Sequence, residues 1–333
     1  MSDQMIPIAI DATFPRSLVE FSAQFGEEDA CEEVLRRWKY GDEHFRCPGC
    51  RGTRAWWLAS RLLDECTTCG RQVSLTAGTV MHGTRKPLRL WFLAIFLFVR
   101  SKQGISAAQL QQDLELGSYQ TAWAWLHKLR WAVNQRATTQ LSGVVEADET
   151  WEGGHEDGCA GRPVAGVKKD LVAAAVEVSG RRPGKWGRVR LALIANGSSE
   201  EIEKFLAEHV ERGTTLLTDG WVSYVMPAKH LELKHIPVNI SKSKHRAHEH
   251  LPAVHRVFSL LHRVLDTTHQ GAVRRKHLQS YLAEFEYRFN RRKAKSRGLL
   301  FQRALDAAAR RAGPYYWEIV GRVDAKTPLR ASA

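Results

Sequence analysis

The chain has 333 residues, of which 44% are hydrophobic and 26% are charged. This composition is typical of a soluble globular protein of about two domains and excludes a largely disordered chain. Lysine and arginine outnumber aspartate and glutamate by 49 to 36, which gives a formal net charge of +13. Such an excess favours a polyanionic partner, because basic side chains that neutralise phosphates release counterions.

The longest apolar run, LWFLAIFLFV at 90–99, predicts a buried helix. A membrane span needs about 20 apolar residues, so no membrane partner is expected. The N-terminus lacks the pattern of a secretory signal. We therefore expect a cytoplasmic protein, associated with the nucleoid, whose six cysteines are not paired as disulfides.

Residues 13–40 have helical patterning and lead into two CxxC pairs. The first pair is Cys47 and Cys50, and the second pair, Cys66 and Cys69, follows after fifteen intervening residues. Two such pairs can donate four thiolates to a tetrahedral Zn²⁺, with the intervening segment forming a hairpin. Incidental buried cysteines or a redox pair would be the alternative. The doubled spacing favours a structural zinc ribbon.

The chain from 87 to 140 is predicted to be helical. Ser106 can cap one helix, and a second helix is expected to begin near Tyr119 after a glycine-containing turn. This pattern fits either a helix-turn-helix or an ordinary helical hairpin, and both stay open. In the first case Lys128 and Arg130 would lie on the exposed part of the second helix and contact DNA.

The pattern then changes to strands interleaved with helices. The strand-like segments are, in order, VVEADETW, LVAAAVEV, VRLALIA and TTLLTDG. A helix with a capping-box pattern, Ser198 with Glu201 three residues later, precedes the last of them. This order predicts an α/β domain. The predicted regions are an N-terminal helical segment with the zinc ribbon, a helical region, the α/β domain and a basic tail, over residues 1–86, 87–140, 141–295 and 296–333.

Two aspartates lie on segments predicted to be strands of this domain. Asp148 is within VVEADETW, and Asp219 ends TTLLTDG. If the first and fourth strands are neighbours, both carboxylates converge on one point, where a cation such as Mg²⁺ would offset their repulsion. Two such ions can hold the attacking and leaving oxygens of a displacement at phosphorus. The alternative is an edge-strand acid and an unrelated turn aspartate.

Several segments in order resemble insertion-sequence transposases of the ISXO type. They are CPGC…CTTC, LTAGTVMHGTRKPLRLWF, VVEADETWEGG, LLTDGWVSY, HRVFSLLHRVL and HLQSYLAEFEYRFNRR, and they cover nearly the whole chain. The resemblance implies a zinc ribbon followed by an RNase H-like mixed sheet with flanking helices and DDE-type chemistry. It implies metal-dependent cleavage at terminal inverted repeats and strand transfer into target DNA, with Asp148 and Asp219 as metal ligands. It also implies structural Zn²⁺, catalytic Mg²⁺ or Mn²⁺, and a homo-oligomer on double-stranded DNA.

The third catalytic position departs from the Asp-Asp-Glu pattern of that family. The matching frame, HRVFSLLH, places His255 at the third site and His262 where the family has a lysine. Seven residues are nearly two helical turns, so both imidazoles share one face. Imidazole can ligate a metal, although it suits transition metals better than Mg²⁺. His262 would contact DNA. Glu249, on a shifted frame, is the alternative third acid.

The segment from Arg288 to Arg311 is densely basic and is predicted to be partly helical. It is predicted either to follow DNA phosphates or to form a solvated charged face. Its candidate DNA contacts are Arg288, Arg291, Arg292 and Lys293. Two other functions stay open: a non-catalytic DNA-binding protein with a degenerate RNase H-like domain, and a structure-selective nuclease that cuts DNA without joining it. The non-acidic residue at position 255 favours the first of these.

Overall fold

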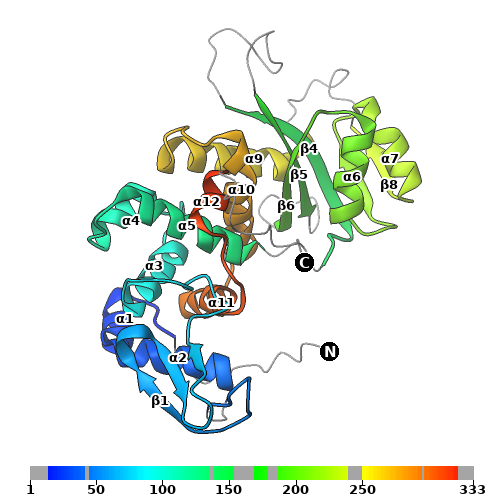
Figure 1. The fold of residues 1–333 in the computed structure, drawn as a ribbon. Helices are drawn as coiled ribbons and strands as arrows, with labels where there is room; N and C mark the ends of the chain where they lie inside the picture. The colour runs from blue at the N-terminus through cyan, green and yellow to red at the C-terminus, as the bar shows by residue number, and fades with distance from the viewer. Residues whose placement is uncertain are drawn as a thin grey trace. The chain divides into compact units, whose positions relative to one another are not determined.

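The computed structural model describes residues 14–41, 45–134, 139–153, 169–178, 186–238, 250–294 and 296–321. The chain folds into two compact units (Figure 1). The first combines Met1–Val133 with Ala294–Ala333, and the second is Asn134–Lys293. None of the helices in the described ranges is long and apolar enough to cross a membrane.

The first unit consists of helices and a small antiparallel sheet. Its helices are α1 (Leu18–Phe25), α2 (Glu28–Tyr40), α3 (Leu88–Arg100), α4 (Ala107–Asp113), α5 (Tyr119–Val133), α11 (Arg297–Arg310) and α12 (Tyr316–Val320). Its strands are β1 (Ala55–Leu58), β2 (Leu63–Cys66) and β3 (Gln72–Ser74), with a 3-10 turn, η1 (Ala59–Arg61), between the first two. The antiparallel pairing of β1 with β2 confirms the hairpin predicted between the two CxxC pairs.

Local sequence explains where the central helices of this unit begin. The Ser106 hydroxyl accepts a hydrogen bond from the Gln109 N–H at 3.1 Å and starts α4, as predicted. The next helix, α5, begins at Tyr119. The apolar run at 90–99 forms most of α3, where Trp91 is fully buried against the stacked ring of Trp125 at a centroid distance of 3.8 Å. These helix positions confirm the helical pattern of this region.

Helix α11 belongs to the core of the first unit and not to a tail. Its Phe301 is fully buried. Five phenylalanine rings surround Phe301 at centroid distances from 5.8 to 6.5 Å: Phe14, Phe21, Phe25, Phe92 and Phe96. The structure therefore differs from the predicted basic tail at 296–333, because the apolar face of α11 packs inward while its charged residues stay at the surface.

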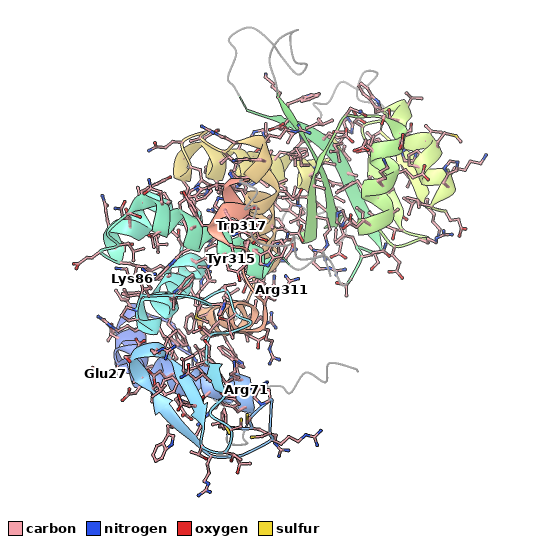
Figure 2. All side chains as sticks on the ribbon, in the orientation of Figure 1. Glu27, Arg71, Lys86, Arg311, Tyr315 and Trp317 are labelled. Atoms are coloured by element: carbon pink, nitrogen blue, oxygen red, sulfur yellow. The ribbon has the colours of Figure 1, made fainter. Side chains whose placement is uncertain are left out.

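The segment after α11 folds back onto α5. The Trp131 indole N–H donates to the Ala312 carbonyl at 3.1 Å, and the Arg311 guanidinium donates to the Trp131 carbonyl at 3.4 Å. Figure 2 shows Arg311, Tyr315 and Trp317 along this returning segment. The rings of Tyr315 and Trp317 are stacked at 6.0 Å. These contacts fix the C-terminal part of the first unit in place.

The second unit contains a mixed five-stranded sheet in the order β6-β5-β4-β7-β8. Its strands are β4 (Val144–Glu152), β5 (Asp170–Val178), β6 (Trp186–Ile194), β7 (Thr215–Thr218) and β8 (Lys234–Pro237). Strands β4, β5 and β6 are antiparallel neighbours, whereas β7 and β8 run parallel to β4. The first and fourth strands are therefore adjacent, which is the condition stated for Asp148 and Asp219 to converge. This order and direction confirm the RNase H-like α/β fold.

Helices cover both faces of this sheet (Figure 1). On one face lie α6 (Ser199–His209), the 3-10 turn η2 (Val222–Tyr224) and α7 (Val225–His230). On the other lie α9 (Pro252–Arg263), a π-helical turn, η4 (Val264–Thr268), and α10 (Arg275–Asn290). The predicted apolar stripe of α9 is buried against this second face, and its members are Val254, Val257, Phe258, Leu261 and Leu265.

The core position of α11 gives a prediction about stability. Phe301→Ala is expected to lower the free energy of unfolding by about 3–5 kcal/mol, because it leaves a cavity among five aromatic rings. The exposed Arg303 of the same helix provides the matched control, Arg303→Ala. Urea denaturation measures both. Equal effects of the two substitutions would show that α11 does not contribute to the core.

Candidate metal centre and acidic site

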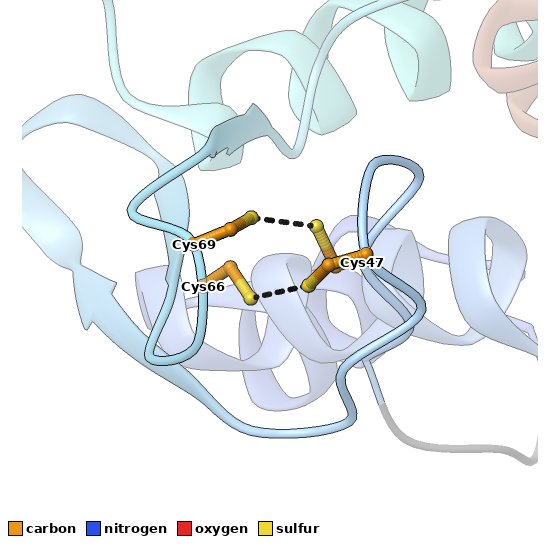
Figure 3. Close-up of side chains that lie close together, drawn as sticks. Cys47, Cys66 and Cys69 are labelled. Atoms are coloured by element: carbon orange, nitrogen blue, oxygen red, sulfur yellow. Dashed lines mark hydrogen bonds between the residues drawn. The ribbon is translucent and has the colours of Figure 1, made fainter.

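The four cysteines at the ends of the β1–β2 hairpin converge (Figure 3). The Sγ atoms of Cys47 and Cys69 lie 3.6 Å apart, and those of Cys50 and Cys66 lie 3.5 Å apart. Sulfur atoms at about 2.3 Å from a tetrahedral zinc ion are roughly 3.8 Å from each other. Backbone N–H groups, above all that of Thr68, lower the pKa of Cys66 to about 6 and favour its thiolate. The quartet can therefore hold a metal ion.

The central strand of the second unit, β4, directs acidic side chains to both faces of the sheet. Side chains at 146, 148, 150 and 152 contact α9, whereas Glu149 contacts Tyr224 on the opposite face. This alternation follows from the two-residue period of a strand. One short strand therefore places carboxylates in several different environments.

Asp148 and His255 come together at the centre of this arrangement. The Nε2 atom of His255 lies 3.6 Å from Oδ2 of Asp148. The backbone N–H of Glu149 donates to the other carboxylate oxygen at 2.9 Å. Burial, reinforced by the negative charges of Glu149 and Asp219, raises the pKa of Asp148 to about 8. The carboxylate of Asp148 is thus destabilised by its surroundings.

Asp219 approaches from the neighbouring strand. Strand β7 pairs in parallel with β4, with Glu146 opposite Leu217. Continuing that register by two residues places Asp219 beside Asp148. The Oδ1 atom of Asp219 accepts a hydrogen bond from the Trp221 N–H at 2.9 Å, which fixes the turn after β7. The charge of Asp219 acts on Asp148, and His255 lies 3.6 Å from Asp148, so the three residues predicted for the catalytic site lie in one region of the second unit.

Glu149, on the opposite face of the sheet, is a further acidic residue close enough for its charge to act on Asp148, and the sequence pattern did not reveal this. The buried Tyr224 hydroxyl donates a hydrogen bond to its carboxylate. Burial raises the pKa of Glu149 to about 7, and the charge of Asp219 acts in the same direction. The available signal was the tyrosine that closes LLTDGWVSY, five residues after Asp219.

The acidic site has donors that suit a divalent cation. In the part of the chain that the structure describes, no lysine or arginine forms an ion pair with Asp148, Glu149 or Asp219. Oxygen ligands with uncompensated negative charge are what Mg²⁺ and Mn²⁺ require, and His255 adds an imidazole. Within the same described ranges, only the cysteine quartet brings three or more ligand atoms within 4.8 Å of one another. The acidic ligands are therefore less tightly gathered than the cysteines.

Glu146 fixes the start of the helix that carries His255. Its side chain is only 2% exposed, and its Oε2 atom accepts hydrogen bonds from the N–H groups of Ala253 and Val254 at 2.7 and 3.0 Å. Burial raises its pKa, and the two N–H groups oppose that change. A carboxylate is favourable here because the first N–H groups of a helix have no intrahelical acceptor.

His262, predicted as a DNA contact, packs against the far end of β4. Its Nε2 atom lies 2.8 Å from Glu152 Oε1 and 3.3 Å from Thr150 Oγ1. Glu152 raises the pKa of His262, with a smaller contribution from Asp266 and against the effect of burial. The side chain is still 41% exposed. The DNA contact stays a prediction, and the observed partner is Glu152. Glu249, the alternative third acid, lies outside the described residues.

The predicted DNA-contacting residues at the end of α10 make structural contacts. Arg288 forms an ion pair with Glu284 at 2.5 Å, and the Arg291 guanidinium lies 4.1 Å from the ring centroid of Tyr287. Arg292 and Lys293 both donate to the Trp186 carbonyl, at 2.5 and 3.3 Å, at the start of β6. Arg292 and Lys293 remain exposed at this edge, so a phosphate contact stays a prediction for them.

The prediction that Arg130 lies on the exposed face of α5 is wrong. This side chain is only 1% exposed, because α3, α4 and α11 all pack on α5. Lys128 is half-buried, with Nζ 5.9 Å from the ring centroid of Trp91, and burial lowers its pKa. The helix pair itself is present, but its basic residues are less accessible than the pattern indicated.

Comparison with known proteins relates the second unit to transposases. Residues 140–290 match the ISXO2-like transposase domain family. An uncharacterized protein in transposable element ISH50 of Halobacterium salinarum is 26% identical over 206 residues, which cover 56% of this chain and 65% of that protein. The matched region thus spans slightly less than two thirds of the relative. The resemblance to ISXO-type transposases is confirmed.

Two solved structures match this chain with low TM-scores. A chain of a pre-cleavage Mos1 transpososome has 13% identity and a TM-score of 0.27, covering 65% of this chain and 73% of its own. A chain of the simian T-cell lymphotropic virus intasome, in complex with the PP2A regulatory subunit B56 gamma, has 13% identity and a TM-score of 0.28. Its match covers 73% of this chain and 78% of its own.

The cysteine geometry predicts that metal binding depends on the intact quartet. Cys66→Ser is expected to reduce bound metal from about one ion per chain to almost none, because three thiolates cannot complete a closed tetrahedral site. Cys31→Ala removes a buried thiol of α2 outside the quartet and should leave the metal content unchanged. Elemental analysis by mass spectrometry measures both. Full metal content in the Cys66→Ser protein would exclude the quartet as the site.

Proposed function

We propose that this chain, whose residues 140–290 match the ISXO2-like transposase domain family, is a DDE-type transposase. It cleaves DNA at the terminal inverted repeats of its element and joins the freed 3′ end to target DNA. The observation that supports this most is the meeting of Asp148, Asp219 and His255 at the centre of an RNase H-like sheet. Burial, with the charges of Glu149 and Asp219, raises the pKa of Asp148, so a bound cation would stabilise its carboxylate.

Asp148, Asp219 and His255 would hold the catalytic Mg²⁺ or Mn²⁺. When bound, divalent ions neutralise charge on the phosphodiester and activate the attacking oxygen for in-line displacement. The protein fixes the ligands in advance: the Glu149 N–H orients Asp148, and the Trp221 N–H orients Asp219. Rate enhancement then comes from positioning and charge neutralisation, with no covalent protein intermediate.

The cysteine quartet would hold a structural Zn²⁺ and stabilise the hairpin of the first unit. The net charge of +13 suits contact with double-stranded DNA, and α4 with α5 is the candidate helix-turn-helix. Both ends of an element must meet before transfer, so we propose a homo-oligomer on DNA. Such a protein would act at the nucleoid.

Two other functions make different predictions for the same assay. A structure-selective nuclease would cut labelled repeat DNA without joining it, and a non-catalytic binder would shift the DNA without cutting it. His255 in place of an acid is the observation that favours the binder. Joined product in a strand-transfer assay with divalent metal supports the transposase.

Removing either aspartate is expected to abolish cleavage. Asp148→Asn and Asp219→Asn should each reduce metal-dependent cleavage of repeat DNA by at least about 100-fold, because each loses a charged metal ligand. DNA affinity in a gel-shift assay should stay nearly unchanged.

Glu208→Gln, on the exposed side of α6, is the control for the loss of one negative charge. This variant should cleave repeat DNA at the wild-type rate. Unreduced cleavage by both aspartate variants would contradict the assignment of the site.

The imidazole at the third position predicts an unusual metal preference. Nitrogen ligands favour transition metals, so the wild-type protein should bind Mn²⁺ in preference to Mg²⁺. His255→Glu should shift the ratio of the two affinities toward Mg²⁺ by about ten-fold or more. Mn²⁺ electron paramagnetic resonance with competing Mg²⁺ measures the ratio. An unchanged ratio in the variant would show that His255 is not a ligand.

A further inference from the structure

Helix α9 contacts β4 at three points along its length. Glu146 accepts the N–H groups of Ala253 and Val254 at the first turn. His255 faces Asp148 at 3.6 Å, and at the last turn His262 pairs with Glu152 at 2.8 Å. The proposed metal ligand His255 therefore lies between two polar attachments of its helix to the catalytic strand.

The two attachments differ chemically. The Glu146 contact is buried and uses backbone N–H groups, which do not titrate. The Glu152 contact uses an imidazole, whose charge depends on pH. Packing alone fixes which face of α9 is buried, because its apolar stripe fills the core. A helix that packs only through an apolar stripe can still rotate or shift slightly against the sheet. Polar contacts at both ends of the helix restrict such movement.

We propose that His262 and Glu152 form a positioning pair, which holds the C-terminal end of α9 on β4 and so keeps His255 opposite Asp148. This inference rests on the proposed metal-dependent function and assigns roles to two residues outside the metal ligands. The imidazole of His262 is directed to a carboxylate of the same unit. Its main effect is on the metal site and not on DNA affinity.

The charged groups around His262 define the pH dependence of the pair. Glu152 faces it from β4 and Asp266 from η4. A cavity of about 780 Å³ beside the pair is also lined by Lys169 and Asp170, and Asp170 is already paired with Arg275. The net surroundings are acidic, and the cavity gives His262 access to solvent protons.

The sign of the effect follows from the raised pKa of His262. The ion pair contributes its full stabilisation below pH 6.5, the ordinary value for histidine, and loses it as the pH rises through the raised value. Deprotonation of the metal ligands strengthens Mn²⁺ binding as the pH rises. The loss of the ion pair should therefore make the gain in Mn²⁺ affinity at alkaline pH smaller in the wild type than in a variant whose residue 262 stays charged. A lysine at 262 would stay charged to about pH 10.

Mn²⁺ affinity of the full-length protein, measured by electron paramagnetic resonance from pH 6 to 9, tests the pair. His262→Gln and Glu152→Gln should each weaken Mn²⁺ binding by about two- to ten-fold at pH 6.5, and the double variant should be no worse than either. His262→Lys should keep wild-type affinity at pH 6.5 and exceed the wild type at pH 9. Arg263→Gln, which removes an exposed charge from the neighbouring position, should match the wild type.

The outcomes separate this proposal from its rivals. Additive losses in the double variant, or unchanged Mn²⁺ affinity in Glu152→Gln, would overturn the positioning pair. A loss of DNA affinity in His262→Gln alone, with Mn²⁺ affinity intact, would also overturn it and assign His262 to DNA. Protein that binds Mn²⁺ with the expected variant pattern but cuts no DNA would support the pair and contradict the proposed function. Wild-type protein that binds no Mn²⁺ would overturn both.

Discussion

The second unit depends on the burial of carboxylates in the central strand of its sheet. Strands disfavour Asp and Glu, and a buried carboxylate is costly unless hydrogen bonds or cations compensate it. Glu146 has two helix N–H groups, Glu152 has an imidazole, and Glu149 has a tyrosine hydroxyl. Asp148 has one backbone N–H and the negative charge of Asp219 beside it. The strand thus gives three of its acids a polar partner within the protein, whereas Asp148 lies beside further negative charge.

The same carboxylates determine where α9 lies. A helix that packs only through an apolar stripe can shift along a sheet at modest cost, because the hydrophobic effect is not directional. Hydrogen bonds and ion pairs have preferred distances and angles, so Glu146 at one end of α9 and Glu152 at the other define its position more sharply. The placement of His255 opposite Asp148 is therefore a consequence of acids that are not themselves proposed ligands.

The two candidate metal sites differed in how far the sequence could predict them. The cysteine quartet is local: two CxxC pairs at the ends of one hairpin must meet, so their spacing was sufficient. The acidic site joins three distant segments and needed the order of the strands. The convergence of Asp148 and Asp219 depended on the adjacency of the first and fourth strands, which was assumed from the sequence and is shown by the structure. Glu149 was missed because period-two alternation assigns it to the opposite face and does not reveal the tyrosine there.

By itself, the sequence determined most helix and strand positions, the α/β class of the second unit, the cysteine site and the buried stripe of α9. Each of these depends on spacing within one segment or on the order of segments. Only the tertiary structure decided that Arg130 is buried, that α11 joins the first unit and that His262 meets Glu152. The physical reason is the same in all three cases. Periodicity shows which face of an element is apolar, whereas the partner of a charged or aromatic side chain depends on segments far away in the chain.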